Sequence, residues 1–508
     1  MSSPEAITRA LPTLYEFFSP GGILARSPLP YEYRPGQLEM AKAVERALAE
    51  RRHLIVEAGT GTGKTLAYLL PALRTGQRVI VSTGTKALQD QLYFRDIPFL
   101  ETLLGELRVC YMKGRANYLC RHKLAALRDQ PILSGLEEID QYRQIAEWER
   151  ETETGDRAEL SGMPETSALW QKLDARADAC LGTTCPDYRR CFITEMRRKA
   201  LESDIVIVNH HLFFADLAVK QEAAGAPDAG VLPEAAAVVF DEAHELEEVA
   251  SSYFGLSVSN VRFEELARDT DVLLRGKAGA ENLPAVTQQL RERARMFFAA
   301  LPMAGDGRQP FTGREEFLES SGDLYLSVCA ALKRMEADME RLTEVDEAPG
   351  LRKRVARLRG ELAFLLESNA HNMVYWMERR AIGGAPDRSA AGRRHAQSRT
   401  TFLQATPIDV SELLRELVFE QIPTVVLTSA TLTVQGGFEH MRRRLGLTEA
   451  RELVVPSHFR YGEQALLYLP PEMPDPRDPE FPEAAARCIQ RVLAITRGRA
   501  FCLFTSYS

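Results

Sequence analysis

A glycine-rich segment near the N-terminus contains residues that can bind phosphate. It reads AGTGTGKT and comprises Ala58, Gly59, Thr60, Gly61, Thr62, Gly63, Lys64 and Thr65. Glycines let the backbone approach phosphate groups closely, and the N–H groups that open a following helix point toward them. In such loops the lysine reaches the β- and γ-phosphates and the hydroxyl holds Mg²⁺. Because the segment lies between an expected strand and an expected helix, we favour ATP binding over a glycine-rich turn without function, although Ala58 replaces the usual first glycine.

A second polar group, Asp241-Glu242-Ala243-His244, follows an apolar segment. An apolar strand that ends in Asp and Glu suits nucleotide hydrolysis, because the first carboxylate binds Mg²⁺ and the second orients and deprotonates the attacking water. We therefore expect Asp241 to be a magnesium ligand together with Thr65, and Glu242 to be the general base. His244 either couples the nucleotide site to the rest of the molecule or caps a helix start. The expected catalytic residues are Lys64, Asp241, Glu242 and His244.

Three further segments carry groups that suit contacts with nucleotide or nucleic acid. The amide of Gln37 can pair with an adenine edge, or it can simply be solvated at a helix start. Short hydroxyls, a glycine and a lysine, which suit a nucleic-acid backbone as well as an ordinary loop, occur together at Thr83, Gly84, Thr85 and Lys86. Small hydroxyl residues at 428–431 can link the state of the γ-phosphate to the grip on a strand. Their order behind GKT and DEAH favours a nucleic-acid motor.

The eight cysteines are unevenly placed, since five of them lie between residues 110 and 191. Such clustering points to metal or redox chemistry. The expected ligands, separated by 59, 4 and 5 residues, are Cys120, Cys180, Cys185 and Cys191. A close triplet with one distant thiolate can hold a [4Fe–4S] cluster, whereas structural zinc more often uses two short-spaced pairs. We favour the iron–sulfur cluster, keep zinc and unliganded thiols as alternatives, and expect the remaining cysteines to be core residues.

Basic and aromatic residues surround these cysteines. We expect the basic side chains to follow the phosphates of a single strand and Tyr118 and Tyr188 to stack on bases, with a solvated charged face as the alternative. The basic residues are Lys113, Arg115, Arg121, His122, Lys123, Arg189, Arg190, Arg197, Arg198 and Lys199.

The elements that must position these residues follow from the apolar pattern. A helix is expected at 34–50, and β-rich apolar segments occur at 53–58, 78–83, 204–210, 235–244 and 424–431. Most of these segments end in polar residues, which is typical of a parallel sheet in an α/β fold with its functional loops at the carboxyl ends of the strands. Segments 105–203 and 245–400 interrupt this pattern, and the second is largely helical in character.

Two adjacent histidines, His210 and His211, follow Asn209 at the end of one of these strands. Neighbouring residues of a strand point to opposite faces, so the two imidazoles would not easily share a metal ion. We assign them to packing or to coupling between domains.

The last part of the chain is expected to contain a strand at 465–470, a helix at 482–496 and the start of another strand at 500–508. Because the chain stops as this strand emerges, we expect a second motor domain that is incomplete.

The composition excludes several classes of protein. With 45% hydrophobic and 26% charged residues, the chain is typical of soluble globular proteins. No apolar run approaches the roughly 20 residues that span a bilayer, and the N-terminus lacks the pattern of a signal peptide. We therefore expect a cytoplasmic protein without membrane contact. The net charge of -8 argues against general coating of polyanions, but a strand-binding enzyme needs only a local basic lining.

The order of the motifs resembles that of the bacterial DinG/XPD-like helicases of superfamily 2. The matching segments, in chain order, are GTGTGKT, STGTKALQDQL, KGRANYLC, DIVIVNHHLFF, DEAH, LTSATL and FTSYS. The resemblance covers nearly all of the chain from residue 30 to 508, and the segment 250–400 matches only in position and helical character. It implies an ATP-dependent DNA helicase of repair or replication that moves 5′ to 3′ on single-stranded and forked DNA. Its expected cofactors are ATP, Mg²⁺ and a [4Fe–4S] cluster, and we expect a monomer.

The resemblance also gives an expected domain arrangement. A first RecA-like motor domain comprises 1–109, 204–249 and 401–445, interrupted by an iron–sulfur domain at 110–203 and a helical arch at 250–400. A second RecA-like domain begins at 446–508. The arginine that reaches across the ATP cleft in this family would lie beyond Ser508, so we expect slow turnover by this stretch alone. Two other functions stay open: an ATPase that translocates without unwinding, and a nucleotide- and DNA-binding protein with an inactive motor.

Overall fold

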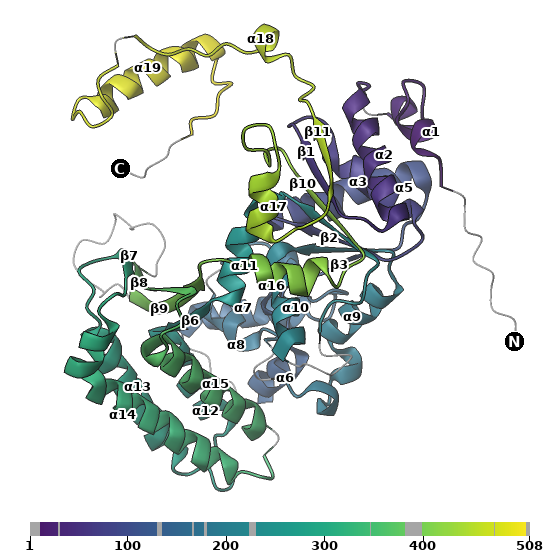
Figure 1. The fold of residues 1–508 in the computed structure, drawn as a ribbon. Helices are drawn as coiled ribbons and strands as arrows, with labels where there is room; N and C mark the ends of the chain where they lie inside the picture. Colours follow the sequence, from purple (N-terminus) through teal and green to yellow (C-terminus); the bar gives the residue numbers. More distant parts are fainter. Residues whose placement is uncertain are drawn as a thin grey trace, which may run out of the picture. The chain divides into compact units, whose positions relative to one another are not determined.

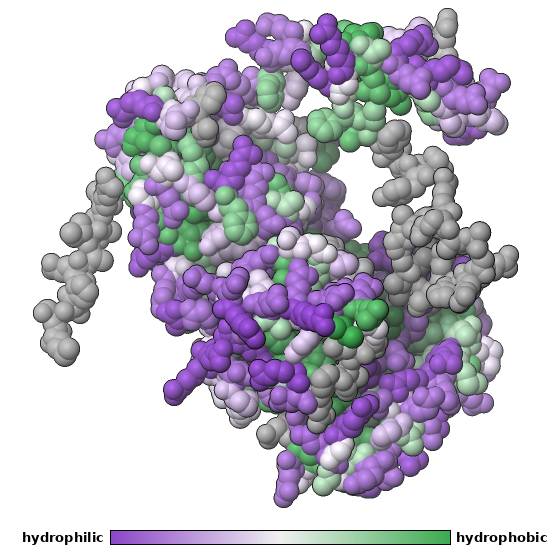
Figure 2. Space-filling view, turned by 180° about the vertical axis from the view of Figure 1, so that it is seen from behind, coloured by the Kyte–Doolittle hydropathy of each residue, from purple (hydrophilic) through white to green (hydrophobic). Residues whose placement is uncertain are grey.

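The computed structural model describes residues 11–28, 31–129, 135–164, 167–176, 180–222, 230–345, 347–381, 399–471 and 473–503. The chain divides into two compact units, Met1–Pro456 and Ser457–Ser508 (Figure 1). Within the described residues, no helix is long and apolar enough to cross a membrane. On the face of the molecule shown in Figure 2, hydrophobic residues form small groups among hydrophilic ones.

A seven-stranded sheet in the order β11-β1-β10-β5-β2-β4-β3 lies at the centre of the first unit. All of its paired strands run parallel. The strands are β1 (Leu54–Ala58), β2 (Val79–Thr83), β3 (Val109–Tyr111), β4 (Ile205–Asn209), β5 (Ala237–Asp241), β10 (Thr424–Ser429) and β11 (Arg451–Val455). The predicted parallel α/β fold is confirmed.

Helices cover both faces of this sheet, which explains why its central strands are apolar along their length. Alternate side chains of a strand point to opposite sides, so Val79 and Val81 join one core while Ile80 joins another. The core with Val79 includes α2 (Pro35–Glu50), α3 (Lys64–Arg74) and α5 (Ile97–Leu104). The opposite core includes α10 (His210–Glu222) and α11 (Leu246–Phe254). Burial of each such aliphatic side chain stabilises the sheet by about 1.5–3 kcal/mol.

The shorter motor helices are α1 (Leu14–Phe18), α4 (Lys86–Gln91), α16 (Ser411–Leu414) and α17 (Glu439–Leu445), and local capping residues set an end of α1, α4 and α17. Thr13 and Glu16 form a reciprocal capping box at the start of α1, which satisfies N–H groups that the helix cannot pair. Gly446 ends α17 in the left-handed conformation, with φ of 72°, where glycine lacks the steric penalty of other residues.

The first insertion lies between β3 and β4. Its helices are α6 (Arg121–Asp129), α7 (Gly135–Trp148), α8 (Ala168–Leu173) and α9 (Phe192–Glu202). Ile145, Trp170 and Phe192 belong to the same apolar core as α10 and α11. The insertion is therefore packed directly against the motor.

The second insertion lies between β5 and β10 and has its own apolar core. It contains α12 (Asn260–Leu273), α13 (Leu283–Ala300), α14 (Arg314–Glu340) and α15 (Ala348–Glu367). A four-stranded antiparallel sheet in the order β6-β9-β8-β7 accompanies them. Its strands are β6 (Leu256–Ser259), β7 (Gly307–Pro310), β8 (Met373–Ala381) and β9 (Arg399–Pro407). The helical prediction for 250–400 missed this sheet, because helix-forming residues surround the short β-rich segment at 374–376.

The last strand of the seven-stranded motor sheet shows that the second unit begins later than predicted. β11 pairs with β1 from Leu54↔Arg451 to Ala58↔Val455, so these residues complete the motor sheet. The division between the two units follows Pro456, later than the predicted start at residue 446.

The second unit contains α18 (Tyr461–Gln464) and α19 (Phe481–Thr496), and the latter confirms the helix predicted at 482–496. The strand predicted at 465–470 is wrong, because the chain there pairs with no other strand among the described residues, and Leu466 is 91% exposed. Residues 500–503 form no strand either, and 504–508 lie outside the described residues.

Candidate functional site

The phosphate loop joins the end of β1 to the start of α3, as predicted. Gly61 and Gly63 have φ of 83° and 82°, a left-handed conformation that other residues rarely adopt. A Cβ atom at Gly63 would also collide with the amide of Gln37. At the start of the loop the Gly59 N–H donates to the Val455 carbonyl at 3.3 Å. The last residue of β11 therefore holds the entrance of the phosphate loop.

Gln37 lies against this loop and is 4% exposed. Its Nε2 donates to the Gly63 carbonyl at 3.0 Å, so its amide is already ordered by the phosphate loop. The glutamine is therefore placed against the phosphate loop, and the pairing with adenine stays a prediction.

Residues from three motifs meet at Glu242. Lys64 Nζ lies 3.1 Å from Glu242 Oε1, and the Ser429 hydroxyl donates to Glu242 Oε2 at 2.9 Å. His244 Nδ1 is 2.8 Å from Ser429 Oγ. Burial opposes ionisation of Glu242, but the charge of Lys64 and the bonds from Lys64 and Ser429 outweigh it and lower its pKa. Glu242 is thus an ionised carboxylate at neutral pH, the state in which it can accept a proton.

The backbone at Glu242 is unusual. Its φ of 61° and ψ of 47° lie in the left-handed region, which costs a non-glycine residue of the order of 1–3 kcal/mol. The Glu242 N–H donates to Asp241 Oδ1 at 3.1 Å, which helps to hold this conformation. The turn points the carboxylate toward Lys64, so the strained residue is the one expected to do the chemistry.

Asp241 lies at the end of β5 and is 7% exposed. Burial raises the pKa of its carboxyl group to about 6, with the charge of Lys64 opposing the rise. The Tyr68 hydroxyl, on α3, donates to Asp241 Oδ2 at 3.0 Å and also hydrogen-bonds the side chain of Thr65. One buried phenol therefore contacts both residues that are expected to bind Mg²⁺.

We expect Tyr68→Phe to raise the Mg²⁺ concentration needed for half-maximal nucleotide binding by roughly tenfold, because a hydrogen bond to a charged group contributes about 1.5–3 kcal/mol. The ring keeps its packing, so folding is preserved. Binding of a fluorescent ADP analogue, titrated with Mg²⁺, measures the effect. Tyr253→Phe, at a half-buried tyrosine of α11, is the matched control. An unchanged Mg²⁺ requirement in Tyr68→Phe would contradict the positioning role.

His210 follows β4 and is fully buried. Its Nδ1 lies 2.7 Å from Ser82 Oγ at the end of β2. Burial lowers the pKa of the imidazole to about 4, against the opposing effect of backbone groups of the DEAH segment. His210 is thus a neutral packing residue that joins two strands, as expected for one of the paired histidines.

This histidine predicts a pH dependence of stability. Its pKa is about 4 in the folded chain and about 6.5 when unfolded, so between these values only the unfolded state binds the proton. The contribution of neutral His210 to the free energy of unfolding is therefore fully present above pH 6.5. It is lost as the pH falls toward 4, by up to about 3 kcal/mol. Urea unfolding at pH 7.5 and pH 5 measures the loss. His210→Gln should lack this part of the slope, and an identical slope in both proteins would refute the assignment.

The proposed strand-contact loop after β2 is only partly accessible. Thr83 and Gly84 are buried, whereas Thr85 and Lys86 are exposed. The Thr85 hydroxyl accepts from the Leu88 N–H at 3.2 Å and so caps α4. Lys86 and the backbone around it are the groups that a nucleic-acid strand can reach.

The four expected cluster cysteines are free thiols. Burial raises the pKa of Cys120, and the nearby thiols of Cys191 and Cys180 raise it further. Burial and the thiols of Cys180 and Cys191 also raise the pKa of Cys185. Within the described part of the chain, no three His, Cys, Asp or Glu side chains are close enough together to hold a metal ion. The structure thus gathers four thiols in one region, a donor set that suits iron, without bringing them to ligand distances.

Two expected DNA contacts near the cysteines are wrong. Lys113 is 5% exposed and its Nζ lies 2.9 Å from Asp156 Oδ2. Tyr118 is 3% exposed, and its hydroxyl accepts from the Lys113 N–H at 3.0 Å. Both side chains are therefore buried and unavailable to DNA, and Lys113 also reaches the motor, where its Nζ lies 3.5 Å from Asp90 Oδ1 of α4. Of the cysteines expected in the core, Cys110 is buried at 5% exposure, Cys329 and Cys488 are partly buried, and the expectation is wrong for Cys502, which is exposed.

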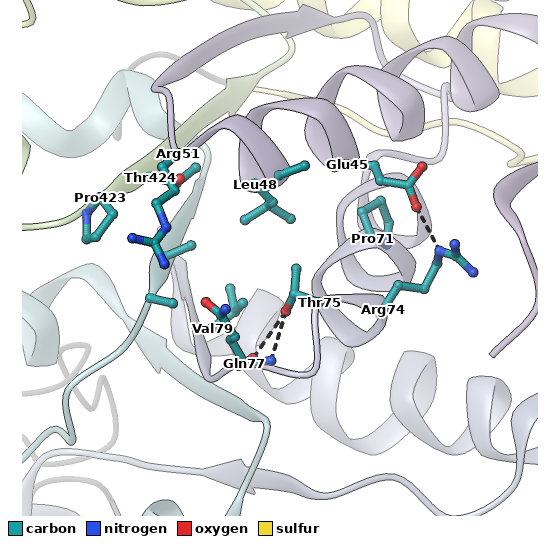
Figure 3. Close-up of a pocket in the computed structure, with 13 residues that line it drawn as sticks. Glu45, Leu48, Arg51, Pro71, Arg74, Thr75, Gln77, Val79, Pro423 and Thr424 are labelled. Atoms are coloured by element: carbon teal, nitrogen blue, oxygen red, sulfur yellow. Dashed lines mark hydrogen bonds and ion pairs between the residues drawn. The ribbon is translucent and has the colours of Figure 1, made fainter. Parts of the chain in front are cut away.

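A cavity of about 480 Å³ lies at the amino ends of the motor strands, away from the phosphate loop and the DEAH segment at their carboxyl ends (Figure 3). It is lined by the first residues of three strands, Val79, Ala237 and Thr424, whereas the expected catalytic residues of the DEAH segment lie at the other end of β5. An ion pair between Arg74 Nε and Glu45 Oε1, 2.7 Å long, lies beside it. This cavity is therefore separate from the nucleotide site.

Comparison with known proteins identifies the family. Residues 35–152 match the model of the DEAD/DEAH box helicases. An ATP-dependent DNA helicase YoaA of Haemophilus influenzae is 34% identical over 501 residues, covering 97% of this chain and 74% of the relative. An ATP-dependent helicase DinG of Mycobacterium tuberculosis is 33% identical over 513 residues, covering 93% of this chain and 71% of the relative. A solved XPD helicase aligns with 92% of this chain and 71% of its own at 14% identity, with a TM-score of 0.44. With the phosphate loop and DEAH segment brought together at Glu242, the chain belongs to the family of the YoaA and DinG ATP-dependent helicases.

Proposed function

We propose that this chain is an ATP-dependent DNA helicase that couples ATP hydrolysis to 5′-to-3′ movement on single-stranded DNA and to unwinding of forked duplexes. The observation that carries the proposal is the meeting of Lys64, Glu242 and Ser429, which come from three distant motifs and share one carboxylate. A change at the γ-phosphate would therefore shift Glu242 and, through Ser429, the end of β10 as well as the phosphate loop. Such a shared contact is what a motor needs to convert hydrolysis into movement.

The nucleotide site would work as follows. The loop 58–65 holds the phosphates, with Lys64 at the β- and γ-phosphates and Gln37 beside the base. Thr65 and Asp241 supply the hydroxyl and carboxylate oxygens that Mg²⁺ prefers. Glu242 accepts a proton from the attacking water, and Ser429 and His244 hold its carboxylate. Mg²⁺ would supply neutralisation of the phosphate charge when bound.

The cysteine cluster and the DNA path complete the proposal. Cys120, Cys180, Cys185 and Cys191 would hold a [4Fe–4S] cluster, and the backbone N–H of Gly182 already donates to Cys180 Sγ at 3.4 Å. Such bonds favour the thiolate that ligates iron. Of the four residues expected to contact the DNA backbone, Thr85 and Lys86 are exposed and would do so, whereas Thr83 and Gly84 are buried behind them. We propose a cytoplasmic monomer with a role in DNA repair or replication.

Hydrolysis and strand displacement test this function together. We expect single-stranded DNA to stimulate ATP hydrolysis, and displacement to require a fork with a single-stranded 5′ tail. Hydrolysis that is stimulated by DNA but displaces no strand would replace the proposal with a translocase. Binding of nucleotide and DNA without hydrolysis would replace it with an inactive motor. The same forks with only a 3′ tail are the control for direction.

A further inference from the structure

The antiparallel sheet of the second insertion has two chemically different faces. Val258, Met377, Leu403 and Ala405 point into the apolar core of the insertion. In Figure 1, α13, α14 and α15 lie on one side of this sheet. Alternate residues of β8 and β9 point the other way, and these include Trp376 and Phe402. Among the described residues, neither ring belongs to any of the three apolar cores. Two large, partly buried aromatic rings therefore lie outside these cores, and the Trp376 indole N–H donates to Thr406 Oγ1 at 2.9 Å.

Arginines lie on both rings. The Arg308 guanidinium, from β7, lies 4.6 Å from the centre of the Trp376 ring. The Arg380 guanidinium lies 5.5 Å from the centre of the Phe402 ring. We name the surface formed by Arg308, Trp376, Arg380, Phe402 and the Glu378 between them the arch sheet face.

Glu378 orders both arginines. The strand pairing places it directly opposite Arg308 on β7 and Phe402 on β9. Its Oε1 lies 3.5 Å from Arg308 Nε and its Oε2 lies 2.6 Å from Arg380. Its own side chain is only 8% exposed, whereas those of Arg308 and Arg380 are 65% and 57% exposed. One buried carboxylate thus holds two accessible guanidinium groups over two rings and leaves one net positive charge.

We propose that the arch sheet face binds single-stranded DNA, with bases stacking on Trp376 and Phe402 and phosphates contacting Arg308 and Arg380. Proteins that bind single strands without sequence preference combine aromatic stacking surfaces with positive charge. Gln404, opposite Trp376 in the sheet, adds an amide that can pair with a base edge. Paired bases in a duplex are already stacked on each other, so the face favours single strands. The inference rests on the proposed function, because it adds a second contact to the strand on which the motor acts.

Tryptophan fluorescence gives a direct test. The chain has three tryptophans, Trp148, Trp170 and Trp376, and stacking of a base on an indole quenches its emission. We expect an oligothymidylate of roughly 20 nucleotides, longer than the site of one binding module, to quench the full chain. Trp376→Phe should lose this quenching yet keep its affinity, since phenylalanine also stacks. Trp148→Phe should still be quenched. Equal quenching in wild type and Trp376→Phe would overturn the proposal.

The salt dependence of binding tests the arginines. We expect the double variant Arg308→Gln/Arg380→Gln to lower the slope of log affinity against log salt by roughly 1.4, because each lost phosphate contact contributes about 0.7 on a single strand. The double variant Trp376→Ala/Phe402→Ala should bind roughly fivefold or more weakly. Arg341→Gln, at a 78% exposed arginine after α14, and Tyr15→Ala, at a 65% exposed tyrosine of α1, are the matched controls. Thermal melts confirm that each variant is folded.

The outcomes separate this inference from the proposed function. If the chain hydrolyses ATP with DNA but shows no Trp376 quenching and an unchanged salt slope, the proposed function stands and the DNA contact on the arch sheet face is refuted. If Trp376 is quenched but the chain never hydrolyses ATP, the DNA contact stands and the proposed function is refuted. Quenching by an acidic peptide but not by oligothymidylate would assign the face to a protein partner and overturn the DNA proposal.

Discussion

Glu242→Gln should lower the ATP turnover number by roughly 10²- to 10⁴-fold, the usual contribution of a general base, while nucleotide still binds. The amide keeps the shape of the side chain and can still contact Ser429 and Lys64, but it cannot accept a proton from water. The carboxylate is also ionised, because the charge of Lys64 outweighs the effect of burial on its pKa. Single-turnover hydrolysis and equilibrium binding of a fluorescent ATP analogue separate the two effects.

Glu248→Gln is the control for this substitution, because Glu248 is an exposed carboxylate of α11 six residues later in the chain. Its turnover should match that of the wild type. If Glu242→Gln hydrolysed ATP as fast as Glu248→Gln, another group would have to be the base, and the proposed role of the DEAH segment would be wrong.

Cys185→Ser should lose its iron. We expect about four irons and four acid-labile sulfides per chain in anaerobically purified wild-type protein, and close to none in this variant, since a cubane needs a thiolate at each iron. Elemental analysis for iron and zinc, with a sulfide assay, measures both proteins. The test is independent of hydrolysis, because the nucleotide site uses none of these cysteines.

Cys488→Ser is the matched control, since Cys488 lies on α19, outside the first insertion. It should keep the full iron content. Zinc in place of iron, or no metal in the wild type, would remove the cluster from the proposal and leave the nucleotide site unaffected. Equal iron in both variants would instead show that Cys185 is not a ligand.

The sheet and the phosphate loop could be predicted because their signals are local. Each central strand is a short apolar run, and β1 leads directly into GTGTGK, so a few consecutive residues carry the whole pattern. Asp241 and Glu242 follow their strand in the same way. Residues at the ends of neighbouring parallel strands then meet without any further information.

The contacts that orient these residues could not be predicted, because they join distant parts of the chain. Ser429 and Glu242 are 187 residues apart, and Tyr68 and Asp241 are 173 apart. No spacing rule reads such a pair from one sequence. Lys113 shows the reverse error: its charge suggested a DNA contact, but Asp156, from the same insertion, makes it a buried ion pair.

The order of strands in the motor sheet has a consequence for how the chain is made. Among the described residues, the strands that pair with β1 are β10 and β11, and the Leu432 N–H that bonds Glu57 of β1 comes 375 residues later in the chain. At roughly 5–20 residues per second of synthesis, the strand that carries the phosphate loop waits about 20–75 s for its neighbours. Both insertions therefore emerge from the ribosome before this strand can be placed. The nascent chain exposes an apolar strand with two open edges during that interval, and its need for protection by chaperones should end only when β10 and β11 have been translated.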